Sequence, residues 1–223
     1  MIMAESRRGM VIRSALLTPL CLIGAFFVGA LMGDVVFNGL SGYAHDEAKA
    51  ALAALPALLC VIAGGALWGR ALARIARVDA VKRMMWAGAL GYGPTVILVG
   101  LTLTVLENLI VEQRRWPDLP LHVVFTLLFT PAALVVAAVG ALAIGVALKS
   151  KALAIRLAFR SGLAAAVAFL VVDLLLDALG YRVGAPGAAE RATMLTVMLT
   201  SNVAASFAGG GVIGLLLSSR RAA

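Results

Sequence analysis

Long apolar runs separated by short polar segments dominate this chain. Six runs of predominantly apolar residues cover about 14–37, 50–69, 85–108, 121–147, 158–180 and 193–217. A helix that crosses the hydrocarbon core of a bilayer needs about 20 such residues. The pattern therefore predicts an all-α membrane protein, with residues 1–223 forming one polytopic domain of six transmembrane helices. Because the connecting segments are short, no ordinary soluble domain fits between the helices.

Composition and charge agree with this prediction and orient the chain. Hydrophobic residues make up 62% and charged residues 13% of the sequence. With the N-terminus inside, 14 of the 19 Lys and Arg residues fall on the inner side. Short cytoplasmic loops are enriched in Lys and Arg, so both termini are expected in the cytoplasm. Trp68 and Trp86 fall near the inner interface, where they are expected to form part of an aromatic belt.

The positions of the basic residues also affect how the net charge of +8 is interpreted. In a soluble domain such a charge could indicate nucleic-acid binding. Most of this charge lies at the predicted cytoplasmic face, where it suits anionic lipid better than DNA. We expect that lipid contact at residues near the second and third helices: Arg70, Arg74, Arg77, Lys82 and Arg83. The Ala-rich composition and the excess of Arg over Lys indicate a GC-rich bacterial gene and hence the cytoplasmic (inner) membrane.

Carboxylates inside the predicted spans are the sharpest functional signal. Asp173 and Asp177 are four residues apart and share one face of the fifth helix. Counting the helical rise from the following loop places Asp173 level with Asn202, close to Thr200 on the sixth helix. These side chains either line a wet outer vestibule or form a buried pair in which Asp173 is hydrogen-bonded to Asn202 or Thr200.

Three further polar residues lie near the predicted outer interface. Glu107 falls level with His122, which suggests a carboxylate–imidazole pair, and Asp34 lies close to the end of the first helix. If the four carboxylates converge, the outer half of the bundle attracts cations. The expected substrate or ion pathway therefore consists of Asp173, Asp177, Asn202, Thr200, Glu107, His122 and Asp34.

Glycines spaced by four predict close helix packing. Gly65 with Gly69 and Gly210 with Gly214 allow two helix backbones to approach, within the bundle or between copies of the chain. Two short segments also resemble each other: Ala63–Gly69 matches Ala208–Gly214, and Arg13–Leu16 matches Arg160–Leu163. Repeated helical hairpins or chance in an Ala/Gly-rich sequence can each explain these matches.

The enzyme and metal-binding motifs tested against the sequence do not support an enzymatic function or a metal site. Gly39–Gly42 fits a GxSG serine-protease pattern, but the sixth helix has no histidine to act as a base. We therefore expect no catalytic activity, no metal site and no cofactor. The predicted function is a small transporter or channel-like protein for a cation or small polar solute. The alternative is a non-catalytic structural or assembly subunit of a larger membrane complex. A homo-oligomer or association with other membrane subunits is expected in either case.

Overall fold

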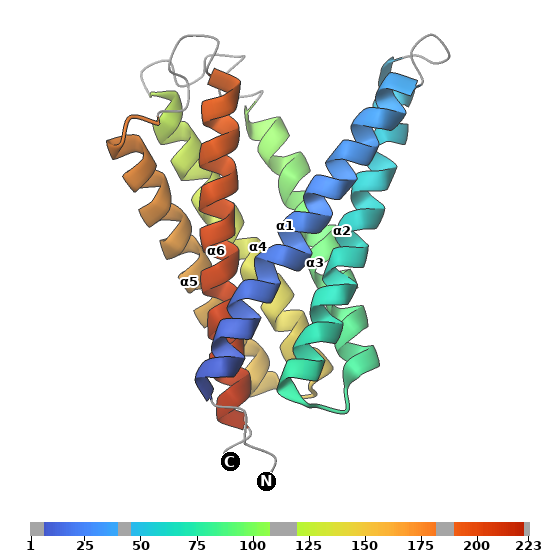
Figure 1. The fold of residues 1–223 in the computed structure, drawn as a ribbon, viewed down its shortest axis with the longest axis vertical. Helices are drawn as coiled ribbons and strands as arrows, with labels where there is room; N and C mark the ends of the chain where they lie inside the picture. The colour runs from blue at the N-terminus through green and yellow to red at the C-terminus, as the bar shows by residue number, and fades with distance from the viewer. Residues whose placement is uncertain (1–6, 40–45, 108–119, 182–189, 221–223) are drawn as a thin grey trace.

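The computed structural model describes residues 7–39, 46–107, 120–181 and 190–220, and in these ranges it contains α-helices and no β-strand (Figure 1). The helices are α1 (Arg7–Gly39), α2 (Asp46–Ala76), α3 (Val81–Glu107), α4 (Leu121–Ala147), α5 (Lys151–Ala178) and α6 (Glu190–Arg220). Each contains a segment long and apolar enough to cross a membrane. The prediction of six helices capable of spanning a bilayer is confirmed.

The six helices are arranged as a ring in chain order. Each helix packs against the next along the sequence, and α6 packs against α1 to close the ring. Helix α6 also touches α2 and α4 to a small extent. The start of α1 and the end of α6 lie at the same end of the molecule (Figure 1).

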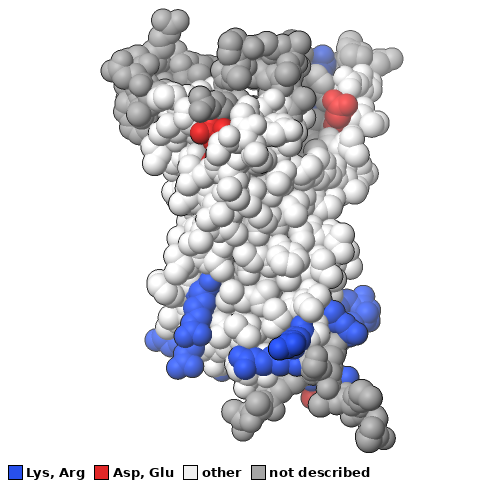
Figure 2. All heavy atoms as spheres, turned by 60° about the vertical axis from the view of Figure 1, so that its left-hand side comes forward, with Lys and Arg blue, Asp and Glu red and all other residues white. Residues whose placement is uncertain are grey.

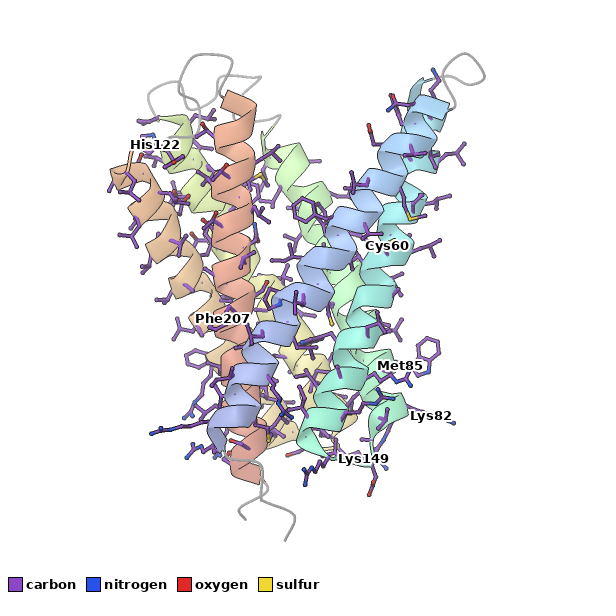
Figure 3. The ribbon with its side chains drawn as sticks, in the orientation of Figure 1. Cys60, Lys82, Met85, His122, Lys149 and Phe207 are labelled. Atoms are coloured by element: carbon purple, nitrogen blue, oxygen red, sulfur yellow. The ribbon has the colours of Figure 1, made fainter. Side chains whose placement is uncertain are left out.

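Charge distinguishes the two ends of the bundle. Most Lys and Arg residues in view gather toward one end and Asp and Glu toward the other (Figure 2). Lys82 and Lys149 lie at the first end, called the basic end below, and His122 lies at the opposite, acidic end (Figure 3). The middle of the molecule presents an uncharged surface in this view, as a bilayer core requires.

Two tight turns join helices at the basic end. Helix α2 ends at Ala76, so Arg70 and Arg74 lie on the helix while Arg77 adopts a left-handed conformation with φ 47°. Lys149 has φ 54° in the turn between α4 and α5. Such residues commonly terminate helices, and their positive charge suits the negative end of a helix dipole. Both turns keep their helix pairs close together at this end.

Small residues bring the helix backbones into contact. A Cβ atom added at Gly65 would overlap the carbonyl oxygen of Gly88 on α3, and one added at Gly69 would overlap that of Met84. The α1–α6 contact uses the same device, because Gly210 and Gly214 lie directly against Ser14. All four glycines singled out in the sequence therefore contact helices of their own chain.

The packed core differs between the two halves of the bundle. Toward the basic end, one cluster of buried residues joins all six helices, and Leu72, Met84 and Ile144 are among its fully buried members. Toward the acidic end, a second cluster of buried residues joins only α4, α5 and α6 around Phe125 and Phe169. Helices α1 and α2 lean away from α5 and α6 in this half (Figure 1).

Candidate functional site

A cavity of about 430 Å³ lies between two groups of helices that diverge toward the acidic end: the α1–α2 group (α1 and α2) and the α4–α6 group (α4, α5 and α6). Its walls come mainly from α1, α3, α4 and α6, and they consist chiefly of Phe, Leu, Ile, Val, Met, Ala and Gly residues. The volume falls within the roughly 300–1,000 Å³ that is usual for small-molecule sites. The wall residues include Leu22, Ile23, Phe26, Phe27, Ala30, Val96, Val99, Leu103, Phe129, Val136, Leu195, Met198 and Leu199.

No charged side chain is found among the described residues that line the cavity. Its polar lining residues are uncharged, and four of them lie in the part nearer the basic end: Thr18, Trp68, Tyr92 and Ser161. Asn202 and Ser206 add polar groups to the α6 wall. The cavity is thus an apolar space with a partly polar floor.

Hydrogen bonds across the floor join four helices. The Trp68 indole on α2 donates to the Thr18 hydroxyl on α1 at 3.0 Å, and Thr18 donates to the Ser14 carbonyl at 2.8 Å. Ser14 in turn donates to the carbonyl of Gly210 on α6 at 2.7 Å. From α5, the Ser161 hydroxyl donates to the carbonyl of Gly209 at 3.1 Å. The floor is therefore a connected structural element as well as a polar surface.

The position of Trp68 corrects the expectation that it belongs to an interfacial belt. Trp68 is 2% exposed, whereas Trp86 is 61% exposed and can face lipid. Small neighbours explain the difference, because Gly64 packs against α1 and Gly65 and Gly69 pack against α3. A tryptophan within such a glycine-rich segment lies on closely packed helix faces. The glycines on either side of Trp68 in the sequence could therefore have indicated its burial.

Tyr92 and Asn202 offer polar groups to the cavity. The Tyr92 ring lies beside Trp68, with ring centroids 6.4 Å apart, and no hydrogen bond to its hydroxyl occurs among the described residues. The Asn202 side-chain amide donates to the carbonyl of Met198 in its own helix at 2.7 Å. That bond uses one of its two N–H groups and leaves its side-chain oxygen available to a ligand.

Asp173 does not have the partner that helical rise suggested. It is 6% exposed and accepts a hydrogen bond from the Thr126 hydroxyl of α4, instead of from Asn202 or Thr200 of α6. Rise along a helix predicts depth but not rotation about the axis, and the α5 face that carries Asp173 points toward α4. His122 and Asp177 lie close enough to Asp173 to interact electrostatically with its carboxyl group.

The other expected pathway residues are dispersed. Asp34 and Thr200 are exposed, and His122 and Asp177 are half-buried beside Asp173. Glu107 is the last residue of α3, and its side chain lies outside the described residues, as does its expected pair with His122. Of the seven expected residues, Asn202 is the one found in the lining of the cavity.

Aromatic stacking accompanies the Asp173–Thr126 contact in the α4–α5 interface. Phe125 stacks on Phe129 with centroids 4.3 Å apart, and Phe129 lies 6.4 Å from Phe169, nearly parallel to it. Phe125 is adjacent to Thr126, and Phe169 precedes Asp173 by four residues. The carboxylate is therefore part of the packing between two helices.

Metal ligands do not gather in the part of the chain that the structure describes: no group of three or more His, Cys, Asp or Glu side chains could hold an ion there. Cys21 and Cys60 are both free thiols. The described residues therefore assign no metal site.

Comparison of the chain with protein-family models, with curated proteins and with solved structures finds no match. The candidate site consequently rests on the geometry of the cavity and the chemistry of its lining.

Proposed function

We propose that the protein is a small membrane transporter that holds an uncharged, largely apolar amphiphile in its central cavity. One observation carries the proposal: the cavity of about 430 Å³ has apolar walls, a polar floor and no charged lining residue among those described. Ligand sites of this kind bury apolar surface for affinity and use a few polar groups to orient the ligand.

The absence of charge from the described lining decides the class of solute. An ion in an apolar, membrane-embedded cavity needs an opposite charge or several dipoles, because charge at this depth costs about 2.5–3.5 kcal/mol even on insertion scales. An apolar chain gains about 25 cal/mol for each Å² that it removes from water. The walls therefore favour a hydrocarbon chain over the cation or small polar solute that the carboxylate pattern suggested.

Polar contacts would fix the orientation of such a molecule. The Tyr92 hydroxyl can donate to or accept from an alcohol, ester or amide group, and the Asn202 amide offers a further donor and acceptor. Trp68 contributes mainly its ring, because its N–H is already bonded to Thr18. Asp173 and Asp177 are assigned a role in the α4–α5 interface.

Trp68 provides a direct test. In a variant with Trp86→Phe and Trp116→Phe, Trp68 is the single fluorophore, and a monoacylglycerol brominated along its chain serves as a contact quencher in lipid nanodiscs. Because Trp68 lines the cavity, we expect its quenching to saturate as the mole fraction of quencher rises. An unbrominated monoacylglycerol should compete and restore the fluorescence.

A matched variant that keeps only Trp86 serves as the control. Trp86 is exposed on α3, so its quenching should rise without saturation, in proportion to the quencher in the bilayer. If Trp68 behaves like Trp86, or is not quenched at all, cavity binding is excluded. The alternative proposal, a non-catalytic subunit of a larger membrane complex, then becomes the better one, and co-purification of partners is the next experiment.

The proposed topology places both termini and the basic end in the cytoplasm of a bacterium, in its inner membrane. The gathering of Lys82 and Lys149 at one end supports this orientation. Single cysteines at the exposed positions Lys82 and Asp34, in a chain without Cys21 and Cys60, test it with an impermeant thiol reagent applied to intact cells. Labelling is expected at position 34 and absent at position 82; the reverse pattern inverts the topology.

Three further expectations stay proposals. Anionic lipid is proposed to contact the exposed side chains of Arg70, Arg74 and Arg77, and charge-neutral substitutions there should weaken retention on anionic vesicles. Homo-oligomerisation is proposed because six helices enclose little volume, and light scattering of the purified chain tests it. Duplicated hairpins would account for one correspondence: Ser14 and Ser161, equivalent in the two matched segments, both donate to carbonyl groups of α6.

A further inference from the structure

We infer that the solute is a single-chain lipid amphiphile that enters the cavity sideways from the bilayer, through an opening between α1 and α6 in the acidic-end half. The inference rests on the proposed function, because it presupposes that the cavity binds an amphiphile. It adds the entry route and the kind of molecule that can use this route.

The closest contacts between α1 and α6 lie near the basic end. Gly210 lies against Ser14 and Thr18, and Gly214 lies against Met10 and Ser14. The hydrogen bond from Ser14 to the Gly210 carbonyl lies at the same level. Beyond this point α1 inclines away from α6, as Figure 1 shows. The two helices are therefore joined at one end and spread toward the other.

Residues on both sides of the spread line the cavity and are also solvent-accessible. Phe26 on α1 and Leu199 on α6 both line the cavity. Their exposed fractions are nevertheless 50% and 41%. Because the cavity is open to its surroundings, such accessible lining residues on the two diverging helices suit the rim of its opening. We therefore place the opening between Phe26 and Leu199.

The depth of this rim determines what can pass. Phe26 is 12 residues from Ser14, and Leu199 is 11 residues from Gly210, so both lie about 17–18 Å from the α1–α6 contact at the usual helical rise. Both residues fall within segments apolar enough to cross a membrane. The opening therefore faces the hydrocarbon of the bilayer, from which a water-soluble ion cannot enter but a lipid chain can.

The volume of the cavity and the chemistry of its lining further restrict the kind of molecule that can bind. A cavity of about 430 Å³ is near the lower end of the roughly 300–1,000 Å³ range for small-molecule sites. That space suits one hydrocarbon chain better than a phospholipid with two chains and a charged headgroup. The uncharged lining favours a neutral polar group on the chain, which Tyr92 at the floor or Asn202 on the α6 wall can bind.

Cross-linking across the opening tests the route. In the variant with Trp68 as its single tryptophan, Cys21→Ala and Cys60→Ala remove the native thiols, and Phe26→Cys with Leu199→Cys places one thiol on each side. The protein is folded and purified first, then reacted with reducible dithiol cross-linkers of increasing length. Brominated monoacylglycerol is added afterwards, and Trp68 fluorescence is followed over time. The cross-link should slow quenching at least tenfold, and reduction should restore the original rate.

A second cross-link provides the matched control. The sulfur atoms of Met32 on α1 and Cys60 on α2 lie 4.0 Å apart, so Met32→Cys in a chain that keeps Cys60 and carries Cys21→Ala allows a link between α1 and α2. This link constrains α1 at a similar level but does not cross the opening to α6. Quenching of Trp68 should remain fast in the control.

The outcomes separate the two proposals. Slow quenching that appears with the α1–α6 link alone supports sideways entry. Equally fast quenching with and without that link overturns sideways entry while cavity binding stands. If Trp68 is not quenched before any cross-linking, cavity binding fails, and the entry route fails with it.

Discussion

The basic-end and acidic-end halves of the bundle use the same six helices for different purposes. In the basic-end half, all six helices share one core, and short turns hold α2 against α3 and α4 against α5. In the acidic-end half, one buried cluster joins α4, α5 and α6, while α1 packs on α2 through Gly29 and Gly33 and leans away from α6, and a cavity lies in the space between. One half is a junction, and the other can accommodate a ligand.

Side-chain size accounts for much of this difference. Gly65, Gly69 and Gly210 let backbones touch where the helices converge. Where α1 and α6 diverge, the larger side chains of Phe26, Phe27 and Phe129 form part of the cavity wall. Association of membrane helices depends on such packing because lipid supplies no hydrophobic drive between them.

Polar contacts differ between the halves in the same way. The bonds from Trp68 to Thr18 and from Ser14 to Gly210 link α2, α1 and α6, so they connect both groups of helices. The contact from Thr126 to Asp173 links α4 and α5 within one group. Loss of a floor bond should loosen the contacts among α1, α2 and α6. Loss of the Asp173 contact should affect the α4–α6 group alone.

The largest expected effect comes from closing the backbone approach at the junction. In Gly69→Ala the new Cβ atom would overlap the Met84 carbonyl, and backbone must move to relieve the clash. We expect a loss of about 3 kcal/mol and a fall in the unfolding midpoint of about 6–12 °C. Thermal unfolding followed by size-exclusion chromatography measures this. Gly24→Ala is the control, since no atom lies within 4 Å of its added Cβ; equal effects would contradict the role of close packing.

A smaller loss of stability is expected from a change in the α4–α6 group, at the α4–α5 interface. Thr126→Val removes the donor to the buried Asp173 carboxyl and should lower stability by about 2 kcal/mol. Thr200→Val, at an exposed position, should change it by less than about 0.5 kcal/mol. Adding Asp173→Leu to Thr126→Val should recover most of the loss, because the buried polar group is then absent. Saturable quenching of Trp68 should persist in all three variants; its loss would place Asp173 in the binding site.

The floor bond from Ser14 should contribute less. Ser14→Ala removes one interhelical hydrogen bond, worth about 1 kcal/mol in membrane proteins, without leaving an ionisable group buried. We expect this loss in chemical unfolding, with Ser219→Ala as the control because the Ser219 hydroxyl donates to the Leu216 carbonyl within its own helix. A decrease in stability larger than that of Thr126→Val would reverse the order of the two contacts.

The smallest effect on stability, with an effect on binding, is expected for Tyr92. Tyr92→Phe keeps the ring beside Trp68 and removes a hydroxyl that bonds to no described residue. Stability should change by less than about 0.5 kcal/mol, while affinity for the monoacylglycerol falls about fivefold, as for one lost hydrogen bond of about 1 kcal/mol. Titration of Trp68 quenching measures the affinity. Unchanged affinity would remove Tyr92 from the polar contacts of the ligand.

The sequence alone determined the class of the protein and the positions of its helices. Apolar runs long enough for a bilayer have few structural options, since backbone groups in hydrocarbon must be satisfied within the helix. The clusters of Lys and Arg likewise predicted which helix ends lie together. Gly65, Gly69, Gly210 and Gly214 were recognisable because their spacing by four is itself a packing pattern.

The tertiary structure decided how each helix is rotated and which neighbour each face meets. Asp173 and Asn202 were predicted to lie at one level, but Asp173 faces Thr126 on α4 while Asn202 faces the cavity. Trp68 proved to be buried at the floor because it packs among residues distant in the chain, including Thr18. Rise along one helix follows from residue number, whereas rotation and partner depend on contacts among several helices, and the cavity exists only through those contacts.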